Sequence, residues 1–407
     1  MYLISKEDRS LKGEINISGS KSESNRLLII RAYTSFFKII NLSDSDDTNT
    51  LISALESNDE EINIGHAGTA MRFLTSYFSS TQNSSKILTG SERMKERPIS
   101  ILVDALNSIG ADIEYIDKVG YPPIRLKGKL ISNYTVSLPA NVSSQYLSSL
   151  MMLGISLSEG LIINLSTKIT SLPYIKMTKE LIERVGGKIF IQPDKIIVEP
   201  ILENKISDQT VESDWSSASY FYSLVALSDF SEITISSFFK KSIQGDSRIV
   251  ELYKQFGVET KFRDNKIYLK KNKIVLPDSI SINLENNPDL AQTIVVTCLG
   301  LGVDCDLQGL HTLKIKETDR LLALKKEIEK FDVDRVDVSD QSITLKNNSD
   351  LKTGVSIDTY NDHRMALSFA PLSLINPIII NNPEVVSKSY SNFWNDLKLL
   401  GFNISKK

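Results

Sequence analysis

Charged and hydroxyl side chains recur in short polar turns that come directly before apolar stretches. The clearest case is the segment 17–32, ISGSKSESNRLLIIRA, in which Lys21, Ser22 and Arg26 separate a strand-like lead-in from an apolar helix start. Backbone N–H groups at a helix start favour negative charge, and the two cations beside them do the same. This combination predicts a binding site for an oxyanion.

The same order of polar turn, small residues and apolar helix occurs five more times along the chain. These copies begin at Gly65, Ala140, Glu212, Asn286 and Tyr360. Successive markers within the copies are 75, 73, 73 and 74 residues apart; the markers are Gly68, Ser143, Ser216, Asp289 and His363. Only the first interval, from Ser22 to Gly68, is short, at 46 residues. A period near 74 residues is too long for a solenoid and predicts one compact folding unit used six times, with one copy trimmed.

Each copy continues with a strand, a charged turn, a second helix that ends near a glycine, and a β-hairpin. Residues 86–128 show this order most clearly, and they predict a helix from about Pro98, a favoured first helical residue, to Gly110, a common stop. The last copy lacks its hairpin, and the trimmed first copy has no room for one. We therefore expect six β-α-β-α-β-β units, and we expect the strand near Leu3–Ile17 to complete the domain of the last copy.

The six units divide into two domains of three, with the break at Asp208–Glu212. The predicted domain 1 is discontinuous and comprises residues 1–19 plus 212–407, and domain 2 comprises residues 20–211. Two crossings, near Gly19 and near Glu212, would restrict relative motion to a hinge, which suits an enzyme that closes on its substrate. The first helix of each unit is apolar over much of its surface, which predicts buried helices with sheets facing outward. The sequence thus predicts a two-domain α/β fold with an active site in the interdomain cleft.

Composition argues against several classes of function. The 407 residues include 41% hydrophobic and 24% charged residues, as in ordinary soluble globular proteins, and the formal charge of −3 argues against nucleic acid or an anionic membrane as the main partner. No apolar run is long enough to span a membrane, and the start, MYLISKEDRS, lacks the character of a signal peptide. The two cysteines, Cys298 and Cys305, form no metal-ligand pattern, and they predict reduced thiols and a cytoplasmic protein.

Taken singly, several motifs have more ordinary interpretations. The segment GSKSESNR is similar to a nucleotide-binding P-loop but lacks the GxxxxGKS or GxxxxGKT spacing. The segment KETDR is also typical of a capped helix start with intrahelical charge pairs. The three histidines form no cluster that would support zinc, and Ser143, Ser144 and Gln145 have no Cys/His partner for a hydrolase.

Two further groups of polar residues are interpreted as structural. Asp214 with Ser216 and Ser217 is typical of a helix cap that the internal symmetry repeats. Asp246 and Arg248 are interpreted as a surface ion pair. Neither group is predicted to take part in chemistry.

Eight motifs in the same order cover nearly the whole chain, namely GSKSESNR, GTAMR, MKERPI, SSQYL, PDLAQT, IKETDR, YNDHRMA and KSY. Together they resemble the 5-enolpyruvylshikimate-3-phosphate (EPSP) synthase family of enolpyruvyl transferases. The resemblance implies a two-domain fold of six such units. It also implies transfer of the enolpyruvyl group of phosphoenolpyruvate to the 5-hydroxyl of shikimate 3-phosphate, with release of phosphate, on the pathway to chorismate and the aromatic amino acids. No metal or organic cofactor is implied.

The resemblance also implies roles for the turn residues. Lys21, Ser22 and Arg26 would lie where both substrates meet. The residues expected at phosphoenolpyruvate are Gly68, Arg72, Arg97, Arg320, Arg364 and Lys388. Those expected at shikimate 3-phosphate are Ser143, Ser144, Gln145, Ser171, Tyr174, Asp289 and Lys316. For catalysis, Asp289 is the natural base toward the 5-hydroxyl, and Lys21 and Glu317 are candidates for proton movement at the methylene carbon. The sequence leaves open which of these three groups performs which step.

Three positions depart from the usual family pattern, and two other functions remain possible interpretations. His66 and Thr312 stand where the family usually has asparagine, and Phe73 stands where it usually has proline. Gly68 is retained, and we expect ordinary sensitivity to glyphosate, an inhibitor of this family. One alternative is the sister transferase acting on UDP-N-acetylglucosamine, which usually has a reactive cysteine in a mobile loop. The other is a non-catalytic anion-binding protein with the same fold. We expect a monomer.

Overall fold

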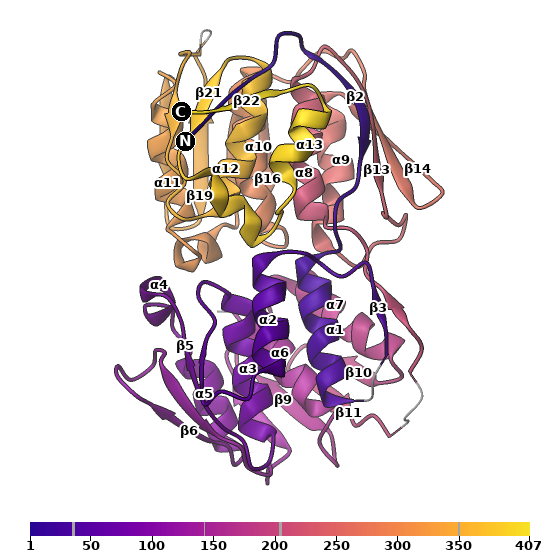
Figure 1. Cartoon of the computed structure of the whole chain (residues 1–407), viewed down its shortest axis with the longest axis vertical. Coiled ribbons are helices and arrows are strands. Elements are labelled where there is room, and N and C mark those ends of the chain that lie inside the picture. The colour runs from indigo at the N-terminus through magenta and orange to yellow at the C-terminus, as the bar shows by residue number, and fades with distance from the viewer. Residues whose placement is uncertain (35–36, 142, 203–205, 349–350) are drawn as a thin grey trace. The chain divides into compact units, whose positions relative to one another are not determined.

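The computed structural model describes residues 1–34, 37–141, 143–202, 206–348 and 351–407, and these residues form two compact units (Figure 1). Unit 1 comprises Met1–Ser18 and Glu212–Lys407, and unit 2 comprises Gly19–Val211. The chain therefore enters unit 2 once, after Ser18, and leaves it once, after Val211. The repeat pattern placed the corresponding divisions after residues 19 and 211.

Two four-stranded sheets in unit 2 share one connection pattern. Their strand orders are β4-β5-β7-β6 and β10-β11-β9-β8. In each, the first two strands of the folding unit run parallel, and the last two form an antiparallel hairpin that pairs with the second strand. The strands are β4 (Glu61–Asn63), β5 (Ser85–Thr89), β6 (Asp112–Tyr115), β7 (Ile124–Lys127), β8 (Thr135–Leu138), β9 (Leu161–Leu165), β10 (Lys188–Ile191) and β11 (Lys195–Glu199).

Unit 1 contains three four-stranded sheets with the same order of strands. The orders are β14-β15-β13-β2, β16-β17-β19-β18 and β20-β21-β1-β22. The strands are β1 (Tyr2–Ser5), β2 (Ser10–Ile15), β13 (Phe230–Ser236), β14 (Val258–Arg263), β15 (Lys266–Lys271), β16 (Ser279–Asn283), β17 (Asp304–Gln308), β18 (Arg335–Val338), β19 (Ser342–Lys346), β20 (Ser356–Ile357), β21 (Ile378–Ile380) and β22 (Asn403–Lys406).

The N-terminal segment completes two sheets of unit 1. Strand β1 lies between β21 and β22 and pairs antiparallel with both, so it fills the place of the hairpin strand that the last folding unit lacks. Strand β2 runs parallel to β13 over six residues. The prediction that the strand near Leu3–Ile17 completes the domain of the last copy is confirmed.

Two first strands are exchanged between folding units. Strand β2 precedes the first helix of unit 2 in sequence but pairs with β13 of unit 1. Strand β12 (Gln209–Thr210) comes directly before the first helix of the segment Glu212–Lys407 of unit 1. It nevertheless pairs in parallel with β3 (Ile39–Ile40) in unit 2. The trimmed first folding unit therefore has a sheet of two short strands, and no hairpin follows its second helix among the described residues.

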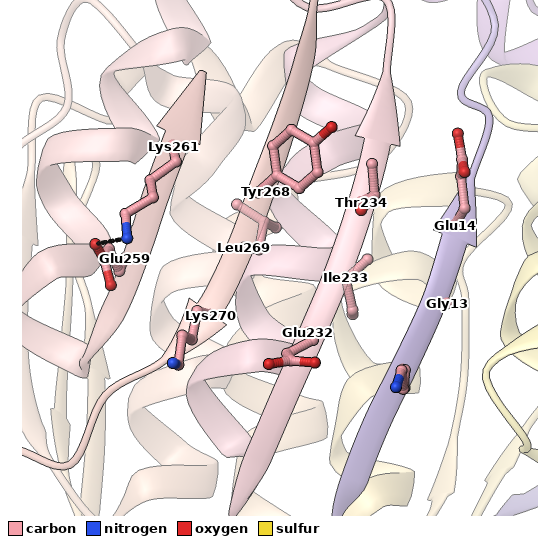
Figure 2. A pocket seen from close by; sticks show the side chains of 11 residues that line it. Gly13, Glu14, Glu232, Ile233, Thr234, Glu259, Lys261, Tyr268, Leu269 and Lys270 are labelled. Atoms are coloured by element: carbon pink, nitrogen blue, oxygen red, sulfur yellow. Dashed lines mark ion pairs between the residues drawn. The ribbon is translucent and has the colours of Figure 1, made fainter. Parts of the chain in front are cut away.

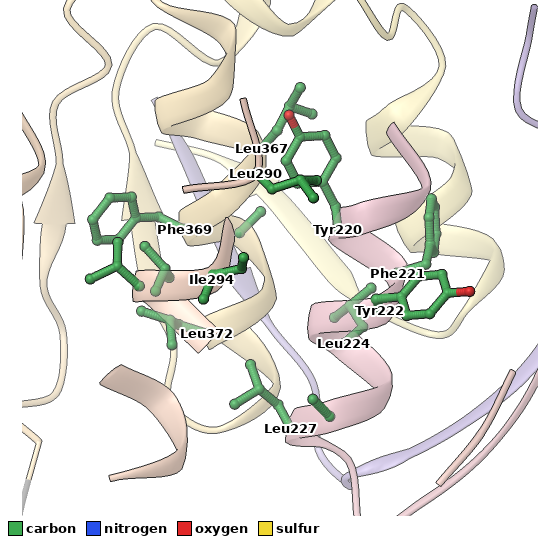
Figure 3. Close-up of a cluster of buried hydrophobic side chains, with 14 of the residues drawn as sticks. Tyr220, Phe221, Tyr222, Leu224, Leu227, Leu290, Ile294, Leu367, Phe369 and Leu372 are labelled. Carbon is green, nitrogen blue, oxygen red and sulfur yellow. The ribbon is translucent and has the colours of Figure 1, made fainter. Parts of the chain in front are cut away.

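The first helices of the folding units form the interior of each unit, as predicted. In unit 1, α8 (Trp215–Leu227) buries 12 of its 13 residues, and α12 (His363–Phe369) buries all seven. Figure 3 shows Tyr220 and Leu224 of α8 in the same buried cluster as Ile294 of α10 (Ala291–Leu301) and Phe369. Strand β13 alternates buried and exposed residues, so its sheet covers this core with one face and meets solvent with the other.

The remaining helices and 3₁₀ turns surround these cores. In unit 2 they are α2 (Asp46–Glu56), α4 (Glu92–Lys95), α5 (Ser100–Ser108) and α7 (Leu172–Arg184), whereas the first helices in its interior are α1 (Lys21–Tyr33), α3 (Gly68–Ser80) and α6 (Ser144–Gly154). In unit 1 they are η1 (Gly245–Arg248), α9 (Ile249–Leu252), η2 (Tyr253–Phe256), η3 (Pro288–Leu290), η4 (His311–Ile315), α11 (Arg320–Glu329), η5 (Ala370–Leu374), η6 (Pro383–Lys388) and α13 (Phe393–Leu399).

The predicted helix from Pro98 to Gly110 is shorter than expected. Helix α5 runs from Ser100 to Ser108, because Ile99 has a non-helical backbone conformation. The Pro98 carbonyl instead accepts hydrogen bonds from Arg72 Nη2 at 3.2 Å and from the Tyr146 hydroxyl at 2.6 Å. Tertiary hydrogen bonds therefore override the local preference for proline at a helix start.

Within the described ranges, no helix is both long enough and apolar enough to cross a membrane.

Strand β1 provides a test of how the chain ends support unit 1. Ile4 is fully buried, whereas the neighbouring Leu3 is half-buried. We expect Ile4→Ala to lower the free energy of unfolding of unit 1 by about 2–5 kcal/mol, because a cavity remains in the core. Both tryptophans, Trp215 and Trp394, belong to unit 1, so their fluorescence during urea unfolding reports on this unit. Leu3→Ala is the matched control, and an equal loss in the two variants would contradict this account.

Candidate active site

A single buried arginine binds three carboxylates in unit 1. Arg320 is 2% exposed and lies at the first position of α11. Its Nε lies 2.6 Å from Asp362 Oδ2, its Nη1 lies 3.0 Å from Asp289 Oδ1, and its Nη2 lies 2.9 Å from Glu317 Oε2. This guanidinium brings together residues that are up to 73 positions apart in sequence, since Asp289 precedes Asp362 by that number.

Three further cations surround the same carboxylates. Arg364 Nη2 lies 3.2 Å from Asp289 Oδ2, and Lys316 Nζ lies 3.7 Å from Asp289 Oδ1. Lys388 Nζ lies 2.9 Å from Glu317 Oε1. Every site residue that the sequence predicted in unit 1 therefore belongs to one cluster of alternating charges.

The helix caps of unit 1 hold this cluster in place. Asp362 is the N-cap of α12: its Oδ1 accepts a hydrogen bond from the Arg364 N–H at 2.9 Å. Asp319 is the N-cap of α11 and accepts from the N–H groups of Leu321 and Leu322. Such caps fix the first turn of a helix, so the side chains of Arg320 and Arg364 start from defined positions.

The cations control the ionisation of Asp289. Burial alone would raise the pKa of Asp289, but Arg364, Lys316 and Arg320 together hold it well below its usual range. For Lys316, the Asp289 carboxylate favours the charged form, but burial and the neighbouring Arg320 and Arg364 leave its pKa lowered overall. In unit 1 by itself, Asp289 is therefore a carboxylate that accepts hydrogen bonds.

In unit 2, Gly68 is the first residue of α3, Arg72 lies in the next turn of the same helix, and Arg97 contacts Gly68 from outside the helix. Arg72 is buried and donates from Nη1 to the Gly68 carbonyl at 3.1 Å. Arg97 lies against Gly68, because a Cβ added there would stand 2.5 Å from Arg97 Nη1. The buried Arg97 Nε has no hydrogen-bond partner among the described residues. A guanidinium with such an unsatisfied buried donor is suited to bind an anion.

Arg26 is built into the helix interior of unit 2. Its Nε donates to Thr178 Oγ1 at 2.7 Å, its Nη1 to the Ser22 carbonyl at 2.9 Å, and its Nη2 to Ser148 Oγ at 3.1 Å. Burial lowers the pKa of Arg26 to about 10. One helical turn earlier, Lys21 Nζ lies 3.0 Å from Asp47 Oδ2 of α2. Lys21, Ser22 and Arg26 therefore lie on the first turns of α1, as the motif predicts.

The remaining predicted residues of unit 2 lie at the starts of α6 and α7. Ser143 is the N-cap of α6, and its Oγ accepts from the Gln145 N–H at 3.3 Å. The Gln145 side chain donates to Thr69 Oγ1 of α3 at 3.1 Å. Ser144 is the first residue of α6. Ser171, with φ +54°, precedes α7, and Tyr174 lies in its first turn.

The three departures from the family pattern have defined surroundings. His66 Nδ1 lies 2.9 Å from the hydroxyl of Ser91, the N-cap of α4. Phe73 is fully buried, and the Arg26 guanidinium lies 5.5 Å from its ring centre. The buried Thr312 hydroxyl makes no hydrogen bond to the described residues.

One interpretation made from the sequence is wrong, and a second is confirmed only for Asp214 and Ser217. Asp246 does not form a surface pair with Arg248; it is buried and accepts a hydrogen bond from the Ser216 hydroxyl. Ser216 is not part of the helix cap: Asp214 caps α8 through the Ser217 N–H, whereas Ser216 Oγ accepts from Arg364 Nη2 at 3.3 Å. The sequence offered one signal that Ser216 belongs near the cluster of charges: Ser216 occupies the same repeat position as Asp289, which follows it in the next folding unit.

One pocket in unit 1 lies apart from these residues. Figure 2 shows it on the sheet of β2, β13, β14 and β15. Its volume is about 420 Å³. Charges of both signs line it, including the Glu259–Lys261 ion pair, and no predicted site residue does. Among the described residues, no group of three or more His, Cys, Asp or Glu side chains is arranged to hold a metal ion.

Comparison with known proteins agrees with these motifs. A family model described as EPSP synthase (3-phosphoshikimate 1-carboxyvinyltransferase) matches residues 51–397. A 3-phosphoshikimate 1-carboxyvinyltransferase of Bacteroides fragilis is 44% identical over 406 residues, which cover 99% of this chain and 98% of the relative. The chain belongs to the EPSP synthase family.

Other members and solved structures extend this likeness. The 3-phosphoshikimate 1-carboxyvinyltransferase of Aliivibrio fischeri is 34% identical over 420 residues, covering 96% of this chain and 97% of the relative. The EPSP synthase structure from Acinetobacter baumannii has a TM-score of 0.75 at 18% identity, covering 100% and 99% of the two chains. The enolpyruvyl transferase NikO of Streptomyces tendae has a TM-score of 0.74 at 14% identity, covering 99% and 98%. The fold is therefore that of the EPSP synthases and enolpyruvyl transferases.

The close contact at Gly68 gives a test of the arginine beside it. We expect Gly68→Ala to raise the KM for the anionic donor substrate on the order of 10- to 100-fold, because the added methyl group displaces the Arg97 guanidinium. Arg97→Ala is the reference variant. If the methyl group acts through Arg97, the double variant is no worse than Arg97→Ala alone. Additive effects in steady-state kinetics would refute this.

Proposed function

We propose that this protein transfers the enolpyruvyl group of phosphoenolpyruvate to the 5-hydroxyl of shikimate 3-phosphate, giving 5-enolpyruvylshikimate 3-phosphate and phosphate. The observation that carries the proposal is the arrangement of Asp289 and Glu317 around Arg320, with Lys388, Lys316 and Arg364 beside them. Such a cluster supplies proton-transfer groups and anion-binding cations at one place, which this reaction needs. The family membership supports the same reaction.

The reaction would proceed by addition and elimination. The 5-hydroxyl oxygen loses its proton and attacks C2 of phosphoenolpyruvate while C3 gains a proton, which gives a tetrahedral intermediate. This intermediate then loses phosphate and one proton of the new methyl group. We propose Asp289 as the base toward the 5-hydroxyl, and Lys21 and Glu317 as the candidates for proton movement at C3.

The low pKa of Asp289 in unit 1 is compatible with this role. The cations Arg364, Lys316 and Arg320 hold the carboxylate ionised, so it is ready to accept a hydrogen bond from a hydroxyl group. A carboxylate or phosphate of the substrate bound to Arg364 would offset part of this positive charge. The basicity of Asp289 would then rise when substrate is bound, at the stage when a proton must be removed.

We propose that these predicted residues hold the substrates. Lys21, Ser22 and Arg26 would lie where the donor and the acceptor meet. The donor set comprises Gly68, Arg72, Arg97, Arg320, Arg364 and Lys388. The acceptor set comprises Ser143, Ser144, Gln145, Ser171, Tyr174, Asp289 and Lys316. The unsatisfied buried Nε of Arg97 supports the first set. The N–H groups at the starts of α6 and α7 support the second, because a helix start favours a phosphate.

The acceptor distinguishes this function from its rivals. A sister transferase would release phosphate from phosphoenolpyruvate with UDP-N-acetylglucosamine, whereas a non-catalytic anion-binding protein would release none. Cys298 and Cys305 are both buried, in α10 and β17, which argues against the loop cysteine of the sister enzyme. We further propose a cytoplasmic monomer, whose mass in solution would be near 45.5 kDa.

The central test is a phosphate-release assay with each acceptor in turn. We expect turnover with shikimate 3-phosphate, and we expect Asp289→Ala and Glu317→Ala each to lower kcat by about 10²- to 10⁴-fold, because each removes a proton-transfer group. Asp340→Ala is the control, since this exposed carboxylate pairs with Lys314 on the surface of unit 1. Near-wild-type turnover in both active-site variants would refute the assigned roles.

Glyphosate provides a second test, because its phosphonate and carboxylate present the same pair of anions as phosphoenolpyruvate. With glycine at position 68, no side chain crowds the space beside Arg97. We expect competitive inhibition against phosphoenolpyruvate in initial-rate measurements. Inhibition that phosphoenolpyruvate does not relieve would contradict a shared subsite.

A further inference from the structure

Asp246 lies at the end of a hydrogen-bonded chain that leads to Asp289. Its carboxylate accepts a hydrogen bond from the Ser216 hydroxyl. The Ser216 Oγ atom in turn accepts a hydrogen bond from Arg364 Nη2 at 3.3 Å. Arg364 Nη2 also lies 3.2 Å from Asp289 Oδ2. One guanidinium nitrogen is therefore shared between the Ser216 hydroxyl and the Asp289 carboxylate.

The main chain around Asp246 is tied to the start of α8. Gln244 Oε1 accepts from the Trp215 N–H at 2.9 Å, and Gln244 Nε2 donates to the Ser213 carbonyl at 2.9 Å. Asp214 caps α8 through the Ser217 N–H at 2.7 Å. Because Asp214 supplies the cap, the Ser216 hydroxyl remains available to bridge Asp246 and Arg364.

We propose that Asp246 is a positioning residue for the enolpyruvyl-transfer site: through Ser216 it holds the Arg364 guanidinium against Asp289. This inference rests on the proposed role of Arg364 in binding phosphoenolpyruvate. An ionised carboxylate can only accept hydrogen bonds, so it fixes the Ser216 hydrogen toward itself and leaves the oxygen lone pairs toward Arg364. Neither Asp246 nor Ser216 was among the site residues predicted from the sequence.

The charges around Asp246 determine the pH at which its carboxylate is ionised and binds the Ser216 hydroxyl most strongly. The pKa of Asp246 is raised to about 6 overall: burial, the nearby Asp289 and Asp214 raise it, whereas Arg364 and the hydrogen bond from the Ser216 hydroxyl lower it. Above this pH, Asp246 is ionised and its hydrogen bond from Ser216 is charge-assisted, which makes it stronger. Below this pH, the neutral group holds Ser216 less firmly.

The test compares Ser216→Ala, Asp246→Ala and the double variant at pH 7.5. We expect each single change to raise the KM for phosphoenolpyruvate by about 10- to 100-fold, the value for a lost hydrogen bond to a charged group. The double variant should be no worse than either single one, because one bridge is removed in all three. A wild-type KM in Ser216→Ala would overturn the proposal, and so would additive losses.

Asp246→Asn separates positioning from folding. Asparagine keeps a neutral acceptor for Ser216, so its KM should lie between those of wild type and Asp246→Ala at pH 7.5 and should match wild type at pH 5. Using the ratio to wild type cancels the ionisation of the substrate phosphate. A ratio that does not change between pH 5 and 7.5 would overturn the proposal, as would a KM below that of wild type.

Two controls distinguish failure of this inference from failure of the proposed function. Asp214→Asn removes a charge from the same helix start but keeps a good N-cap, and we expect its KM to be unchanged. Arg364→Ala tests the donor site itself. An unchanged KM in Arg364→Ala would refute the substrate assignment, whereas a raised KM there together with a normal Ser216→Ala would refute only the role of Asp246.

Discussion

The ion pairs of Arg320 hold the polar cluster of unit 1 together. One guanidinium, 2% exposed, binds Asp289, Glu317 and Asp362 from three different segments. Three carboxylates at this distance would repel one another without a shared cation. Loss of one partner from a buried ion pair typically costs about 3–5 kcal/mol, so the geometry of the candidate acid and base depends on this one side chain.

The fold supplies this geometry by bringing helix starts together. Arg320 begins α11, and Asp362, which contacts Arg320, is also the cap of α12. The first helices α8, α10 and α12 are almost fully buried, so packing fixes their positions. Apolar packing between helices and the polar cluster at their ends therefore depend on each other: the first sets where the caps lie, and the second satisfies charges that would be costly to bury alone.

Much of the fold and of the candidate site was predictable because both repeat. The period near 74 residues indicated the folding units, and the polar turns indicated the side chains now found at the starts of α1, α3, α6, α7 and α11. Asp246 was not predictable: a carboxylate two residues from Arg248 is equally typical of an exposed pair, and only tertiary packing buries it against Ser216. The pairing of β12 with β3 was hidden for a similar reason, since strands of two residues have no periodicity.

The alternation of charge around Asp289 has a consequence for the order of events in the proposed reaction. While Arg364, Lys316 and Arg320 face it, Asp289 is a weak base. An anionic donor bound to Arg364 would weaken that stabilisation, so the carboxylate would gain basicity only when the donor is in place. The same nitrogen of Arg364 also donates to Ser216 Oγ, and the Ser216 hydroxyl donates to Asp246. The arginine is thus placed between the group that fixes its position and the group whose basicity it controls, and proton removal from the acceptor hydroxyl would be coupled to donor binding.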